Sequence, residues 1–250
     1  TVIEPFAVQE KFPHPAIHVH YARGATLAEA FYQSLQLPYQ LLVVGDPLCQ
    51  PWAAIPVVEA TTKDDGRALE PGRVLSGRVE IEPVARTADA ADAAAAPAVD
   101  RFELFVDGIR SGQCAPGGRF VLDTPSLADG HHELRVVGIL SSPVETQGRL
   151  VIPFTTANHG RTLSLTVEPE TVDIDGTLRV SVAGADLEGV TLFSNGRVIG
   201  RTAGRQATVE VPAEVLGAGR VQIRALGRAG PGVSNSVSAA PVTVDVRRGK

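Results

Sequence analysis

The sequence has no methionine, not even at position 1, and only two cysteines among 250 residues. We therefore expect the chain to be an excerpt from a longer protein, in which case the lack of a signal peptide carries no information. Cys49 and Cys114 lie 65 positions apart in what we expect to be different domains. This separation argues against a disulfide framework and leaves the redox compartment open.

Long apolar runs and clustered positive charge are also missing. No stretch approaches the roughly 18 apolar residues that a spanning helix needs, so we expect no membrane span in this chain. The net charge is −5, and apart from Arg247-Arg248 the arginines are scattered singly. The chain therefore offers no basic patch for nucleic acid or for an anionic membrane. The 25 glycines and 18 prolines, with 44% hydrophobic residues, indicate a globular chain with many turns.

Two stretches of the chain occur twice and in the same order. FELFVDG (102–108) corresponds to VTLFSNG (190–196), 88 positions later. GHHELRVVG (130–138) corresponds to GRVQIRALG (219–227), 89 positions later. Two matches with a nearly constant offset predict an internal duplication of about 90 residues.

Each copy has the two-residue period of a half-buried β-strand, because the first, third and fifth residues of FELFVDG are apolar and face one side. Asp107-Gly108 and Asn195-Gly196 then supply dipeptides that tolerate the positive φ of a tight hairpin turn. Short strands between turns predict a mainly β fold with two tandem immunoglobulin-like β-sandwiches. Helices inside either repeat, or one sheet running continuously through both, would contradict this prediction.

The first 55 residues differ from the rest. AIHVHYA (16–22) alternates apolar and other residues, which predicts a short strand. TLAE (26–29) predicts a helix N-terminus with a capping box. LLVV (41–44) is typical of a strand buried in a parallel sheet. Strand, helix and strand make a partial α/β segment, a βαβ unit that cannot bury its own faces, so we expect the rest of an α/β domain to precede it in the parent protein.

Residues 1–55 also resemble a known family. The motif Gly-Ala-Thr-Leu-Ala-Glu-Ala (24–30), followed by a hydrophobic strand that ends in Gly45-Asp46-Pro47, is similar to the closing helix and strand of gingipain-like, caspase-fold peptidase domains. It is more similar still to a related α/β domain of exported bacterial proteins. The resemblance implies that immunoglobulin-like domains follow. It implies no peptidase activity for this chain, because the family's His-Cys dyad lies upstream of this helix.

We divide the chain into three parts: the end of an α/β domain at 1–55, a first sandwich at 56–157 and a second sandwich at 158–247. The first sandwich contains an alanine-rich segment (87–100) with no counterpart in the second. Matching the strands on either side makes it an insertion of about 13 residues. Because its alanines have no apolar face to bury, we expect a loop and not a docked helix.

His14, His18 and His20 are candidates for a metal site. If 16–22 is a strand, His18 and His20 lie on one face, and neutral imidazoles at that spacing can share an ion. No carboxylate or cysteine has a supporting spacing, so ordinary hydrogen-bonded histidines are the competing interpretation.

Asp46 and Cys49 are candidates for catalysis, because they follow the carboxyl end of a predicted parallel strand, where α/β folds place ligand sites. A Cys49 thiolate beside His18 or His20 would be a minimal nucleophile pair. Against this, Asp before Pro commonly caps a turn, a free cysteine is usually a small buried residue, and nothing orients the base. Whether the parent protein is an enzyme is therefore left open.

Two further features have alternative interpretations. The acidic segments 64–66 and 173–176 could offer oxygens to calcium, but both lack the glutamate of an EF-hand, which favours turns. Phe105 and Phe193 fall on the polar face of their strands in both repeats. Either neighbouring elements cover them or they mark a binding face.

From these features we predict the C-terminal, non-catalytic region of an exported bacterial protein, located outside the cell, on its surface or in the periplasm. Its immunoglobulin-like modules would act as spacer, adhesion or binding domains. The alternative is the tail of a gingipain-like cysteine peptidase whose dyad lies upstream. We expect no cofactor, and a cell-surface protein or a glycan, not nucleic acid, as partner.

Overall fold

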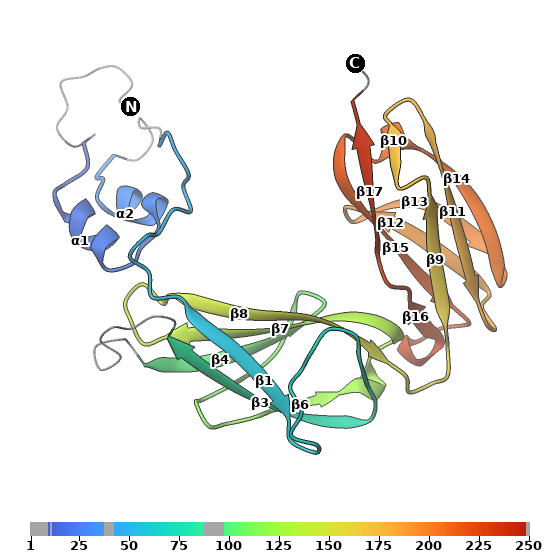
Figure 1. Ribbon diagram of the computed structural model, residues 1–250, viewed down its shortest axis with the longest axis horizontal. Helices are drawn as coiled ribbons and strands as arrows, with labels where there is room; N and C mark the ends of the chain where they lie inside the picture. Colours follow the sequence, from blue (N-terminus) through green and yellow to red (C-terminus); the bar gives the residue numbers. More distant parts are fainter. Residues whose placement is uncertain (1–9, 11, 38–42, 88–97, 249–250) are drawn as a thin grey trace.

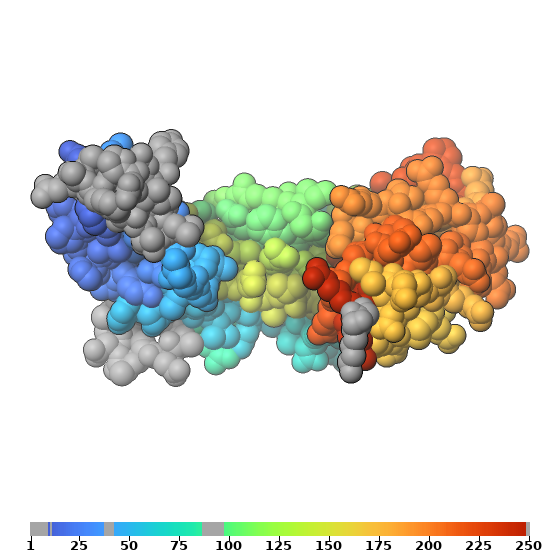
Figure 2. Space-filling view, turned by 90° about the horizontal axis from the view of Figure 1, so that it is seen from above, coloured from blue at the N-terminus to red at the C-terminus, as the bar shows by residue number. Residues whose placement is uncertain are grey.

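The computed structural model describes residues 10, 12–37, 43–87 and 98–248. Three parts follow one another in chain order along the molecule: a small helical region, a first sandwich and a second sandwich (Figures 1 and 2). No helix in these described ranges is long and apolar enough to cross a membrane.

The described residues of the first sandwich form eight strands in two sheets. One sheet has the order β1-β3-β6, and the other places β8, β7, β4 and β5 side by side, with the short β2 parallel to β8. The strands are β1 (Pro56–Thr62), β2 (Arg73–Leu75), β3 (Arg78–Thr87), β4 (Val99–Val106), β5 (Ile109–Cys114), β6 (Phe120–Asp123), β7 (Asp129–Leu140) and β8 (Gln147–Thr156).

The second sandwich repeats this topology strand for strand. One sheet has the order β9-β11-β14, and the other places β17, β15, β12 and β13 side by side, with the short β10 parallel to β17. The predicted duplication is therefore confirmed, and among the described residues β16 is the one additional strand. The strands are β9 (Leu163–Glu168), β10 (Thr171–Asp173), β11 (Thr177–Gly184), β12 (Gly189–Ser194), β13 (Arg197–Ala203), β14 (Gln206–Pro212), β15 (Gly219–Arg228), β16 (Ser236–Ser238) and β17 (Val242–Arg247).

Each sandwich has its own hydrophobic core. The buried residues of the first core lie between Val58 and Phe154, and those of the second lie between Leu165 and Val246. Leu104 and its repeat equivalent Leu192 are at most 1% exposed. Burying a leucine of this kind contributes about 1.5–3 kcal/mol, so the alternating strand residues supply the stability of both units. The mainly β fold with two sandwiches is confirmed.

The two sandwiches nevertheless share hydrogen-bonded strands. β16 pairs antiparallel with β15 and parallel with β7, where Val237 lies opposite Asp129 and Ser238 opposite Gly130. Among the described residues this joins the larger sheets into one 11-stranded sheet. The expectation that no sheet runs through both repeats is therefore wrong, although the link is only two residues long. Glycine permits it, because a Cβ on Gly130 would lie 2.0 Å from the Ser238 carbonyl oxygen.

The linker between the sandwiches is held by a buried carboxylate at the start of β7. Asp129 is 0% exposed and accepts hydrogen bonds from the backbone N–H groups of Asn158 (2.7 Å), His159 (2.9 Å) and Arg161 (2.9 Å). Burial alone raises the pKa of Asp129, but these bonds outweigh it and the pKa lies below its ordinary value. The Arg161 guanidinium donates to the side-chain oxygen of Asn235 at 2.7 Å, which ties the linker to the second sandwich.

The pairing registers revise the length of the alanine-rich insertion. Ile81 pairs with Phe120, and Val180 pairs with Val209, so Ile81 and Val180 are the equivalent positions. Ile81 lies 23 positions before Leu104, whereas Val180 lies 12 positions before Leu192, which makes the insertion 11 residues long. Residues 88–97 lie outside the described residues, so the prediction of a loop there stays a prediction.

The segment predicted as a strand at 16–22 is instead the helix α1 (Ala16–Ala22), so the βαβ unit is wrong at its first element. Pro15 precedes the helix with φ −52°, which favours a helical turn. Tyr21 packs edge-on against Trp52, with 4.7 Å between ring centroids. This contact between residues 31 positions apart is one that the short alternating pattern could not reveal.

Of the next two predicted elements, the helix is confirmed and the strand is not. α2 (Leu27–Gln33) begins at the predicted capping box, where Thr26 Oγ1 accepts from the Glu29 N–H and Glu29 Oε2 accepts from the Thr26 N–H. Part of the strand predicted at 41–44 lies outside the described residues. Positions 43 and 44 are not in a strand, and Val44 is 76% exposed.

Candidate binding groove

A groove of about 740 Å³ lies between the two sandwiches, beside β16. β7 of the first sandwich contributes His131, Glu133 and Arg135, and β15 of the second contributes Gln222 and Arg224. Residues 131, 133 and 135 alternate with buried core residues, so their side chains point away from the first core. The volume is within the ~300–1,000 Å³ that is common for ligand sites.

Equivalent residues of the two repeats line this groove. Pairing of Phe105 with Arg135 in the first repeat corresponds to pairing of Phe193 with Arg224 in the second. Arg135 and Arg224 are therefore equivalent, and Glu133 and the matching glutamine lie two residues before them. All four of these polar side chains belong to the groove, so the duplication has placed the same strand face on both of its sides.

The hydrogen bonds within the two polar pairs are also alike. The Arg135 guanidinium donates to Glu133 Oε1 at 2.8 Å. The Arg224 guanidinium donates to Gln222 Oε1 at 3.1 Å from Nε and 3.0 Å from Nη2. Each pair therefore presents a planar donor and a planar acceptor whose mutual bond limits their rotation, which suits recognition of a polar ligand.

The tips of two equivalent hairpins also line the groove. Asp107 (φ 51°) and Asn195 (φ 48°) both have the left-handed conformation that the sequence predicts for them, and both are followed by glycines at positive φ. Their side chains can hydrogen-bond locally, which makes this conformation less costly for them than for most residues. The hairpin prediction is confirmed in both repeats.

The first of these turns is fixed by a buried histidine. His132, 4% exposed, contacts Asp107 Oδ2 through Nδ1 at 2.6 Å and the Ala128 carbonyl through Nε2 at 2.8 Å. Burial of the ring favours the neutral form, but these two hydrogen bonds outweigh it and raise the pKa of His132. Burial also raises the pKa of Asp107, but its bonds to His132 and to the Glu133 N–H lower the pKa overall.

The groove carries balanced charge at neutral pH. Asp107 and Glu133 are negative, and Arg135 and Arg224 are positive. Burial, together with the neighbouring His132, lowers the pKa of His131, which keeps that ring neutral. A strongly charged ligand would therefore find no excess of opposite charge in this groove.

The two phenylalanines on the polar face are both half-buried. In both repeats the strand pairing shifts register immediately before the phenylalanine, between Leu104 and Phe105 and between Leu192 and Phe193. Such a bulge changes the direction of the side chain that follows it. Phe193 lines the groove, which agrees with the binding-face interpretation, whereas Phe105 is not among the lining residues.

Unsatisfied polar atoms also occur at the groove. Of the four buried side-chain polar atoms that lack a hydrogen-bond partner in the described part of the chain, two are Arg135 Nε and Ser194 Oγ, and both residues line the groove. Buried polar groups without partners are uncommon in folded proteins, and a bound water or ligand is one way in which such groups are satisfied.

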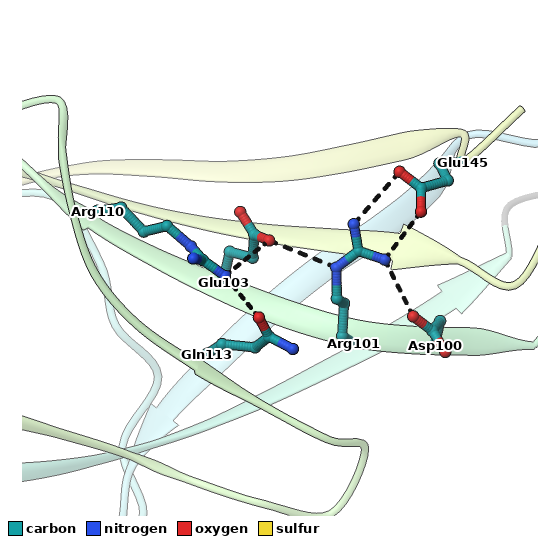
Figure 3. A network of polar contacts seen from close by, with 6 residues as sticks. All are labelled: Asp100, Arg101, Glu103, Arg110, Gln113 and Glu145. Carbon is teal, nitrogen blue, oxygen red and sulfur yellow. Dashed lines mark hydrogen bonds and ion pairs between the residues drawn. The ribbon is translucent and has the colours of Figure 1, made fainter.

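A second polar network lies on β4 and β5, outside the groove residues (Figure 3). Arg101 donates to both carboxylate oxygens of Glu145, at 3.1 and 3.2 Å, and also contacts Asp100 and Glu103. The bonds to Glu145 are the main reason that the pKa of Arg101 is raised. Arg110 joins through Glu103 at 3.1 Å. The donors and acceptors of this network bond to each other, so we interpret the network as a structural feature of the strand surface and not as a binding site.

The candidate metal histidines do not converge. Because α1 is a helix, a rotation of about 200° around its axis separates His18 from His20, which places them on nearly opposite sides, so the premise that they share a face is wrong. His14 accepts a hydrogen bond from the Ala16 N–H at 3.3 Å. Within the described ranges, no group of three or more His, Cys, Asp or Glu side chains is arranged to hold a metal ion.

Asp46 and Cys49 lie in a loop that caps α2. The carbonyls of Pro47 and Cys49 accept hydrogen bonds from the first helical N–H groups of α2, at 3.0 and 2.8 Å. Asp46 Oδ1 accepts from the Leu48 N–H at 3.0 Å, which is the turn-capping role expected of Asp before Pro. The exposed Cys49 thiol accepts from the Tyr21 hydroxyl at 3.4 Å, and this bond is the main reason that the pKa of Tyr21 is raised. None of the described hydrogen bonds joins Cys49 to His18 or His20.

The acidic turns behave as turns. Asp65 accepts from the Thr62 hydroxyl, from the Arg67 N–H and from Arg73, and these bonds lower its pKa to about 2. In the second turn, the carbonyl of Asp173 accepts from the Gly176 N–H at 2.8 Å. Hydrogen bonding within turns therefore accounts for both acidic segments.

Strand pairing defines the class of this protein: mainly β, with two tandem immunoglobulin-like sandwiches. No protein-family model matches the chain, and no curated protein does so. Solved structures that it resembles include the fibronectin(III)-like modules of Clostridium thermocellum CbhA, at 15% identity over 76% of this chain and 93% of that one, with a TM-score of 0.29.

Two other solved structures are similar at the same level. A chimeric titin Z1Z2-Z1Z2 tandem is 13% identical over 76% of this chain and 100% of that one, with a TM-score of 0.38. Bacteroides ovatus SGBP-B, solved with a mixed-linkage heptasaccharide, is 13% identical over 76% of this chain and 47% of that one, with a TM-score of 0.36. These scores are below 0.5, so the fold assignment rests on the strand pairing. None of the comparisons supports the caspase-fold resemblance of residues 1–55.

Proposed function

We propose that this chain is a non-catalytic binding region of an exported bacterial protein, in which two immunoglobulin-like modules hold one ligand groove between them. The observation that carries the proposal is the groove itself, which repeat-equivalent side chains line from both sandwiches. Its residues include hydrogen-bonding and ionic groups but no cysteine and no serine hydroxyl paired with a base. The groove can therefore bind and orient a ligand, and it offers no activated nucleophile.

A fixed arrangement of the two modules supports this role. The β16–β7 pairing, the Asp129 carboxylate and the Arg161–Asn235 bond all act at the same junction. A groove between independently moving domains would lose affinity through the cost of ordering them, and a preformed groove avoids that cost. The same rigidity suits a spacer that holds its binding face at a set angle to the cell envelope.

The domain division is part of this proposal. Residues 56–157 and 158–247 would be the two modules, in agreement with their separate cores. Residues 1–55 would be a separate unit, because Ala25 and Ala30 are the only buried apolar side chains among its described residues. A location outside the cell, on its surface or in the periplasm fits modules that bind an external partner, either a glycan or a surface protein.

A titration tests the proposal. The full chain, labelled with ¹⁵N, would receive separated glycan and protein fractions of bacterial envelopes, and each ligand would be recovered afterwards for chemical analysis. We expect one fraction to shift the amide signals of groove residues such as Arg135 and Arg224, and the ligand to return unchanged. Cleavage of the ligand, or no response of the groove to either fraction, would contradict the proposal.

A further inference from the structure

We propose that the groove binds a neutral oligosaccharide chain, and that each repeat contacts a different sugar unit of it. This inference rests on the proposed binding function and adds the chemical class of the ligand. It starts from the equivalence of Glu133-Arg135 and Gln222-Arg224, which gives the groove two similar polar halves. A ligand built from repeated units can offer the same hydroxyl pattern to both halves.

The hydrogen-bonding chemistry of these pairs matches sugar hydroxyls. Each pair holds one planar donor, a guanidinium, next to one planar acceptor oxygen, with 2.8 Å between donor and acceptor in the first repeat and 3.0 Å in the second. A hydroxyl group both donates and accepts. Two neighbouring hydroxyls on a sugar ring can therefore accept from the guanidinium and donate to the carboxylate or amide oxygen of one pair.

The charge of the groove selects against other ligand classes. Two acidic and two basic side chains balance each other, and the lowered pKa of His131 keeps it neutral. An acidic polysaccharide or a strongly charged peptide would bring charge that the groove does not compensate. A neutral sugar chain needs no such compensation.

Phe193 supplies the aromatic surface of the site, beside the smaller apolar residues Leu226, Ala239 and Pro241 of the same groove. Its ring is half-buried at the groove, next to Arg224 on the neighbouring strand. A sugar ring has an apolar C–H face, and a phenylalanine ring can cover it while the hydroxyl edges bond to the polar pairs. A protein partner would require several aromatic anchors in a dry centre, whereas Phe193 is the one phenylalanine, tyrosine or tryptophan among the residues that line this groove, beside small apolar and polar side chains.

The test uses the full chain and purified probes. Affinity electrophoresis through gels that contain a neutral β-glucan, a neutral α-glucan, a galactomannan or the acidic polymer alginate would identify the binding polymer. Calorimetry with the hexasaccharide and the disaccharide of that polymer would follow. We expect a neutral polymer to retard the chain, and the disaccharide to bind at least 10-fold more weakly, because it reaches only one half of the groove.

Two groove variants and one control locate the binding. Phe193→Ala and Arg224→Ala should each weaken hexasaccharide binding at least 10-fold. Arg224 is exposed, so its replacement should leave the thermal midpoint unchanged, whereas Phe193 is half-buried, so Phe193→Ala should lower the midpoint and its binding is compared at a temperature where the amide spectrum shows a folded chain. Arg110→Ala removes an exposed arginine of the β4–β5 network and should bind like the unmodified chain.

Several results would overturn the inference: no retardation by any neutral polymer, preference for alginate, or equal binding by the groove variants. A groove that responds to an envelope protein but to no glycan would also overturn it, yet would leave the binding function standing. Cleavage of the oligosaccharide would instead contradict the non-catalytic function, so the two failures are distinguishable.

Discussion

Replacing Gly130 by alanine should separate the two sandwiches. Gly130 has φ +93°, and a Cβ there would lie 2.0 Å from the Ser238 carbonyl oxygen and 3.1 Å from its carbonyl carbon. Both contacts are backbone, so no side-chain rotation can relieve them. The strands must move apart, and the two-residue pairing of β16 with β7 is lost.

The magnitude follows from two contributions. Alanine at positive φ costs about 1–2 kcal/mol wherever it stands. Losing a two-residue bridge removes about two backbone hydrogen bonds, at about 0.5–1.5 kcal/mol each. We therefore expect Gly130→Ala to lower the free energy of opening at the junction by about 2–5 kcal/mol, and to weaken ligand binding because the groove loses its shape.

The matched control is Gly117→Ala. Gly117, in the loop between β5 and β6, also has positive φ, +76°, but a Cβ added there would meet no other atom within 4 Å. This variant should cost about 1–2 kcal/mol of stability in the first sandwich and leave the junction intact. Hydrogen exchange at the amides of Val237 and Ser238 reports the opening. Equal protection of these amides in the two variants would refute the reasoning.

Four further substitutions have defined outcomes. Asp129→Ala should release the amides of the 158–161 linker to exchange and cost about 2–4 kcal/mol, because three hydrogen bonds to a carboxylate are lost. Since the pKa of Asp129 is lowered, its contribution is present above about pH 3.8 and is lost as the pH falls further, so linker protection should disappear in acid in the unmodified chain. His132, whose pKa is raised, contributes stability fully below pH 6.5 and loses it as the pH rises through its folded-state pKa. The lowered pKa of His131 acts in the opposite direction, so the two forms are compared at each pH: His132→Gln should lower the melting temperature of the first sandwich more at pH 5.5 than at pH 8, and an equal effect at both pH values would count against the Asp107–His132 pair. Leu104→Ala and Leu192→Ala should each destabilise their own sandwich by about 2–5 kcal/mol in denaturant titrations, because each side chain is fully buried in a separate core; loss of both cores in either variant would contradict that separation.

Local patterns in the sequence identify most of the strands and turns. The alternation in 102–106 predicts a strand, and the Asp-Gly and Asn-Gly dipeptides predict tight turns, from only a few neighbouring residues. The structure has strands and positive-φ turns at these positions. The same locality explains the error at 16–22. Seven residues are too few to separate a period of two from a helical period, and the contact with Trp52 comes from a distant part of the chain.

The groove could not be predicted because it depends on how two domains dock. The groove lies where β7 pairs with β16, and this pairing places Gly130 opposite Ser238, which is 108 positions away in the sequence. One signal was nevertheless available. Arg135 and Arg224 occupy the same polar position in both repeats, next to a phenylalanine on the neighbouring strand. Polar residues kept by both copies of a duplication are candidates for a shared surface.

The central claim is that the two repeats form one rigid unit with the groove between them. Residual dipolar couplings of the full chain in a weakly aligning medium test this most directly. We predict that amides of 56–157 and 163–247 fit one common alignment tensor, and that Gly130→Ala gives two. Two different tensors in the unmodified chain would show that the sandwiches move independently and would contradict the account.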